Sequence, residues 1–72
     1  MADPTITGIV TANLVVARAR LAAATSYVGE AIDLLESHGR EPALLNIEGV
    51  EELIHDALAL IRAARVVHKV EP

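Results

Sequence analysis

Apolar residues recur in an unbroken alternation of four- and three-residue steps through the first half of the chain, and no other feature constrains the fold as strongly. This repeat is typical of a helix that packs against another helix, and strand-like alternation is absent. Asp3 and Pro4 form a helix start, and Gly39 followed by Pro42 forms a helix stop. The sequence therefore predicts a helix over about residues 4–38. The repeat consists of Val10, Leu14, Ala17, Leu21, Ala24, Val28, Ala31 and Leu35.

A second helix is predicted over about residues 47–68. Asn46 is its predicted N-cap, and acidic side chains follow where the helix dipole favours negative charge. A connection of about eight residues joins the two segments, so we expect an all-α fold: one antiparallel helical hairpin in a single domain, residues 1–72. The apolar residues of the second segment have helical spacing: Val50, Leu53, Ile54, Ala57, Leu60, Ile61, Ala64 and Val67.

The two predicted helices differ in length, which predicts an uncovered end. If the turn is centred near Pro42, Lys69 reaches only to about the level of Val15, at ~1.5 Å per residue in both helices. The apolar residues before that level would then need cover from another chain. They are Ile6, Ile9, Val10 and Leu14.

The first helix also carries a second apolar seam beside the first. A helix that is apolar on two seams needs two partner helices, and a hairpin supplies only one. The simplest solution is a homodimer that forms a four-helix bundle. The second seam consists of Ile9, Val16, Ala23 and Leu34.

Asn13, Arg20 and Tyr27 lie at heptad intervals within the apolar sector of the first helix. Each has a purely structural interpretation, because an Asn in a seam fixes register, an Arg stem covers apolar surface and a Tyr ring packs. Tyr and Arg are also the side chains that most often anchor interfaces. We therefore place the candidate partner-binding or dimer interface on these three residues, on the apolar residues of the uncovered end and on the second apolar seam.

Charges are divided along the predicted hairpin. The half near the turn is acidic and the open half is basic, so two antiparallel copies would attract each other. The same pattern would arise if acidic and basic residues were placed only to suit the dipole of each helix. The acidic residues are Glu30, Asp33, Glu36, Glu48, Glu51, Glu52 and Asp56, and the basic residues are Arg18, Arg20, Arg62, Arg65 and Lys69.

Composition excludes several classes of protein. The chain has no cysteine, which removes disulfides and thiolate metal sites, and its net charge is −4. The longest run without a charged residue has 14 residues, from Pro4 to Ala17, shorter than the ~20 residues of a membrane span. No nucleophile elbow or Gly-rich phosphate loop is present. We expect a cytoplasmic, non-enzymatic protein with no cofactor and no membrane contact.

Glu52-Leu53-Ile54-His55 is the most specific-looking motif. This spacing resembles the ligand motif of ferritin-like di-metal carboxylate bundles, which would imply a third ligand from a neighbouring helix, here Glu30. Helical geometry turns Glu52 and His55 roughly 150° from the predicted core direction, toward solvent. A di-metal site therefore ranks as the second alternative, and no metal ligand is predicted.

The first alternative is RNA binding, because the hairpin resembles the architecture of the small dimeric RNA-binding protein Rop. The basic residues would be Arg18, Arg62, Arg65 and Lys69. The net negative charge and the single aromatic residue argue against nucleic acid. The preferred prediction is a small regulator or adaptor that acts as a helical homodimer on an unidentified larger protein, in the manner of phage-type inhibitors or antitoxins.

Overall fold

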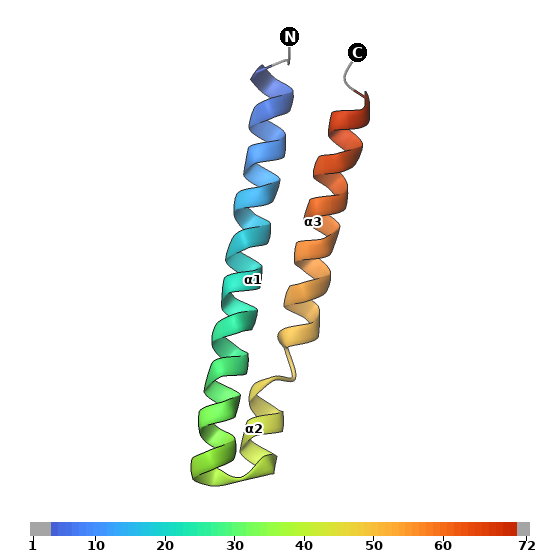
Figure 1. Ribbon diagram of the computed structural model, residues 1–72. Helices are drawn as coiled ribbons and strands as arrows, with labels where there is room; N and C mark the ends of the chain where they lie inside the picture. Colours follow the sequence, from blue (N-terminus) through green and yellow to red (C-terminus); the bar gives the residue numbers. More distant parts are fainter. Residues whose placement is uncertain (1–3, 71–72) are drawn as a thin grey trace.

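The computed structural model describes residues 4–70, and this part of the chain is all-α. It contains α1 (Pro4–His38), α2 (Arg40–Asn46) and α3 (Val50–Val70). The chain reverses after α1, and α2 and α3 then run one after the other along it (Figure 1). The predicted all-α class is confirmed, and the arrangement is that of a helical hairpin.

α1 has the predicted bounds and is continuous. It passes through Gly8, Thr25-Ser26 and Gly29, all of which are residue types unfavourable to a helix interior. The hydroxyl of Thr25 donates a hydrogen bond to the carbonyl oxygen of Leu21, 3.0 Å away, one turn earlier. A threonine that satisfies its hydroxyl in this way is accommodated within a helix.

The predicted eight-residue connection is wrong, because the chain turns at one residue. Gly39 has φ +92°, in the region that favours glycine, and its N–H donates to the carbonyl oxygen of Leu34, 3.1 Å away. α2 begins directly afterwards at Arg40. Pro42 therefore lies in the first turn of a helix, where a missing N–H costs no intrahelical hydrogen bond.

Asn46 is not the N-cap that the sequence predicted. It is the last residue of α2, and a short turn separates it from α3. The N–H of Val50 donates to the carbonyl oxygen of Ile47, 3.1 Å away, and so starts α3. The predicted second helix, 47–68, corresponds in the structure to this turn and most of α3.

The early turn changes the register of the hairpin. The side-chain amide of Asn46 reaches Tyr27 and Glu30 on α1, and Val10 and Leu14 share a hollow with Ile61 of α3. The predicted uncovered end is therefore wrong for these two residues. The error follows directly from the turn, since an earlier reversal allows α3 to extend further back along α1.

Alanine fills the contact between the helices. The buried residues recur every seven positions on both sides of the hairpin, and no large side chain of the described residues is fully buried. Alanine lets two helix backbones approach closely, so the larger apolar residues flank the contact and remain partly exposed. The buried residues are Ala17, Ala24 and Ala31 on α1, with Ala43, Val50, Ala57 and Ala64 on the returning segment.

The molecule is long and thin. Its principal extents are 54 × 14 × 10 Å, and its radius of gyration is 16.7 Å, compared with about 11 Å for a compact domain of this length. Its accessible surface is 5535 Å², whereas a compact monomer of this mass has about 4,300 Å². The hairpin therefore exposes about 1,200 Å² more surface than a compact monomer of the same mass.

Candidate interaction surface

Three hollows follow one another along one side of the hairpin, between α1 and the returning segment. We call this side the groove face. Its hollows are lined mainly by aliphatic side chains, many of which are more than 40% exposed, and the other lining residues are Thr25, Arg40, Arg65, His68 and Lys69. The larger aliphatic residues of the groove face are Leu14, Leu21, Val28, Ile32 and Leu35 of α1 with Leu44, Ile47, Ile54 and Ile61 opposite.

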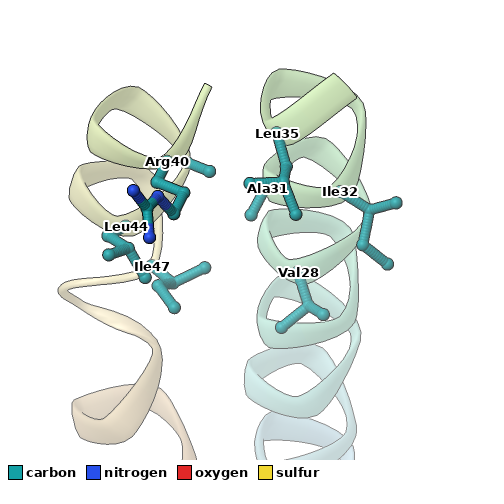
Figure 2. Close-up of a pocket in the computed structure, with 8 residues that line it drawn as sticks. Val28, Ala31, Ile32, Leu35, Arg40, Leu44 and Ile47 are labelled. Carbon is teal, nitrogen blue, oxygen red and sulfur yellow. The ribbon is translucent and has the colours of Figure 1, made fainter. Parts of the chain in front are cut away.

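The largest hollow, about 420 Å³, lies near the turn. In Figure 2, Leu44 and Ile47 lie on one side of it, and Val28 and Leu35 lie on the other. Ile32 borders the same hollow and is 55% exposed. α2 creates this hollow, because it continues the returning segment up to the turn and places apolar side chains opposite the last turns of α1.

The middle hollow, about 300 Å³, shares the lining residue Val28 with the hollow near the turn, so the two hollows adjoin. Its walls include Leu21 and Thr25 of α1 and Ile54 of α3. The third hollow, about 260 Å³, lies at the open end of the hairpin. It is lined by Val10, Leu14, Ile61, Ala64, Arg65, His68 and Lys69.

The opposite side of the buried alanine row is the back face. On α1, the residue three positions before each buried alanine lies on the groove side, and the residue four positions before it lies on the opposite side. The first set is Leu14, Leu21 and Val28, and the second set is Asn13, Arg20 and Tyr27. Tyr27 is 44% exposed there and Asn13 is half-buried. The back face of α1 carries Asn13, Arg20, Tyr27 and Leu34, with Ile9, Val16 and Ala23 beyond them.

The predicted interface residues are thus divided between two faces. Val10 and Leu14 line the open-end hollow of the groove face. The residues named above belong to the back face, and half-buried Ile6 lies seven positions before Asn13, on the same row. Their role in binding stays a prediction. Sequence reasoning placed no interface residue on the returning segment, although Ile47, Ile54 and Ile61 form half of the groove.

One hydrogen-bonded cluster joins the helices through polar groups. The side-chain nitrogen of Asn46 donates to the carbonyl oxygen of Tyr27, 3.0 Å away, and lies 3.5 Å from a carboxylate oxygen of Glu30. These contacts tie the end of α2 to α1. No polar or charged side chain of residues 4–69 is buried.

The geometry does not support the di-metal alternative. The predicted level of Glu30, opposite residue 54, is wrong, because Glu30 lies beside Asn46 instead. Glu52 and His55 are exposed. Within residues 4–70, no three His, Asp or Glu side chains are grouped in a way that could hold a metal ion.

The corrected register preserves the division of charge. The acidic residues of α1 that follow Tyr27 lie beside α2, and Glu51 and Glu52 open α3. At the open end, Arg65, His68 and Lys69 border the third hollow. The open end of the groove face is therefore basic, whereas the turn end has Arg40 in the lining of its hollow and most of the acidic residues on the surrounding helices.

α1 is also long and apolar enough to cross a membrane, judged by length and composition alone. Any 18-residue stretch of α1 that ends before Glu30 contains both Arg18 and Arg20. Each arginine near the centre of a span costs at least about 2.5 kcal/mol.

Comparison of this chain with known protein families, with curated proteins and with solved structures finds no match. Functional conclusions therefore depend on the surface itself.

Proposed function

We propose that this chain is a non-enzymatic interaction protein, a helical homodimer that binds a larger protein and inhibits, sequesters or scaffolds it. One observation carries the proposal: three hollows lined mainly by partly exposed aliphatic side chains follow one another along the groove face. Exposed apolar surface on this scale marks protein or membrane contact, and the two arginines of α1 favour protein and a cytoplasmic location.

The energetics support self-association. Seven small buried residues provide a weak core for a chain without disulfides. The surplus surface of about 1,200 Å² exceeds the ~800 Å² that each partner buries in a standard interface. Two hairpins packed face to face would form a four-helix bundle and move the half-exposed leucines and isoleucines into a shared core.

A second apolar face supports binding of a larger protein. If a second copy covers the groove face, the back face stays exposed. It carries Tyr27 and Arg20, and these residue types often dominate binding energy in protein interfaces. The acidic half near the turn would also suit a basic site on the partner.

Light scattering coupled to gel filtration tests the dimer. We expect a mass of twice 7.6 kDa at micromolar concentration, and dissociation of the dimer by Leu21→Glu, which places a charge in the middle hollow. Val66→Glu is the matched control, since Val66 is 59% exposed and borders none of the three hollows. A helical monomer of wild-type sequence at these concentrations would contradict the proposal.

Affinity capture from the native host tests the larger partner. A specific partner should be retained by wild-type protein and by Val66→Glu, and at least tenfold less by Tyr27→Ala or Arg20→Ala, about 1.4 kcal/mol of binding energy. Equal recovery of the partner with wild-type protein and all three variants would contradict binding through the back face.

A further inference from the structure

We infer that a second copy of this chain covers the groove face and packs antiparallel, with the turn end of each hairpin against the open end of the other. This inference rests on the proposed homodimer and deepens it, because it assigns the dimer contact to one face and fixes its polarity. The back face, with Tyr27 and Arg20, is then left for the larger protein.

The charge distribution selects the antiparallel arrangement. The open-end hollow of the groove face is lined by Arg65, His68 and Lys69. Arg40 lines the turn-end hollow, but it is outnumbered there by the acidic residues near the turn, which are Glu30, Asp33, Glu36, Glu41 and Glu48. A parallel pair would place the two net acidic halves at one level and the two basic ends at another. An antiparallel pair brings the basic end of each copy to the acidic half of the other, twice, by symmetry.

The arrangement of the hollows is compatible with a two-fold pair. The three hollows follow one another along the groove face, and the two outer hollows lie on either side of the middle one. Rotation about an axis through the middle hollow brings the open-end hollow of one copy opposite the turn-end hollow of the other. Midway between Val10 and Leu35 lies the stretch from Leu21 to Thr25, which lines that middle hollow.

The amount of apolar surface favours a copy over a short peptide. A peptide helix would cover one hollow or two, whereas three hollows extend from Val10 to Leu35. A second hairpin has the same length and the same aliphatic row. It therefore covers the whole groove face and buries its own groove face in the same contact.

Cysteine cross-linking tests both the face and the polarity, because the natural chain contains no cysteine. Single substitutions are made at Thr25, Leu14 and Ile32 on the groove face, with Val16 on the back face as the control position. Each variant is first shown by circular dichroism and light scattering to be helical and dimeric, and is then treated with a short bis-maleimide reagent.

In the antiparallel dimer, Thr25 lies near the axis and Leu14 of one copy lies near Ile32 of the other. Thr25→Cys should cross-link by itself, and a mixture of Leu14→Cys and Ile32→Cys should give a mixed dimer at least fivefold more abundant than either variant alone gives with itself. Efficient self-linking of Leu14→Cys and of Ile32→Cys would overturn the polarity. A dimer that links only through Val16→Cys would overturn the face. Absence of any dimer in light scattering would instead overturn the proposed function.

Discussion

The side-chain amide of Asn46 donates a hydrogen bond to the backbone carbonyl oxygen of Tyr27, 3.0 Å away. The side chains buried between the helices are six alanines and one valine, none of which makes a directional contact, so this hydrogen bond helps to set the register between α1 and the returning segment. The register in turn decides which side chains from the two segments meet in each hollow of the groove face.

Asn46→Ala should destabilise the hairpin by about 1 kcal/mol, the net contribution of one such hydrogen bond. For a chain of this size that corresponds to a decrease in Tm of about 4–8 °C, measured by thermal circular dichroism. Glu30→Gln is the control, since it keeps the bond to Tyr27 and changes only the weaker 3.5 Å contact. Equal losses in the two variants would contradict this role of Asn46.

Gly39→Ala should destabilise the turn by about 1–3 kcal/mol, because a side chain is strained at φ +92° even where space is open. Gly29→Ala is the matched control. Gly29 lies inside α1, also with open space around it, so alanine there should stabilise the helix by about 0.5–1 kcal/mol. Urea unfolding of both variants measures the difference, and effects of the same sign would contradict the assigned turn.

Ala57→Leu should separate the helices. Ala57 is 1% exposed at the helix contact, and inserting a larger side chain into a packed core costs about 1–3 kcal/mol. Ala59→Leu introduces the same side chain at an exposed position of α3 and should have little effect. Thermal unfolding of the two variants at matched concentration distinguishes them, and a stable Ala57→Leu protein would mean that the helices do not pack on alanine.

Replacement of Arg18 and Arg20 by leucine should turn α1 into a helix that enters membranes. The double variant would have no charged residue from Pro4 to Gly29, which is longer than the ~20 residues that a span requires. In vesicle flotation, we expect wild-type protein to stay in the aqueous fraction and the double variant to float. Wild-type protein that floats and resists alkaline extraction would contradict the proposed location.

The bounds of α1 were predictable because their signals are local. A long heptad repeat, an Asp-Pro start and a glycine stop all act within a few residues of where they occur in the chain. The turn was not predictable in the same way, since Pro42 is compatible both with a loop and with the first turn of a helix. The structure selects the helix, and α2 results.

The candidate surface was predicted only in part, for a related reason. The residue type of Asn46 suits an N-cap, but its side chain bonds to another helix, and only the tertiary arrangement distinguishes the two roles. The register error followed from the misplaced turn, so Val10 and Leu14 were expected to be uncovered. Ile47, Ile54 and Ile61 line the groove because they lie on the same side of the hairpin as the groove residues of α1. The pattern of a single helix does not determine which of its residues face the same side as those of its neighbour.

The alanine rows have a consequence for how such a protein can change over time. An alanine side chain has no rotamers, so the layer between the two faces contains almost nothing that can rearrange when a neighbouring residue is replaced. A substitution among the outward side chains of one face therefore has few buried side chains through which it could affect the other face. Each face can acquire or lose a partner by changes in a few outward side chains while the backbone that carries both stays the same.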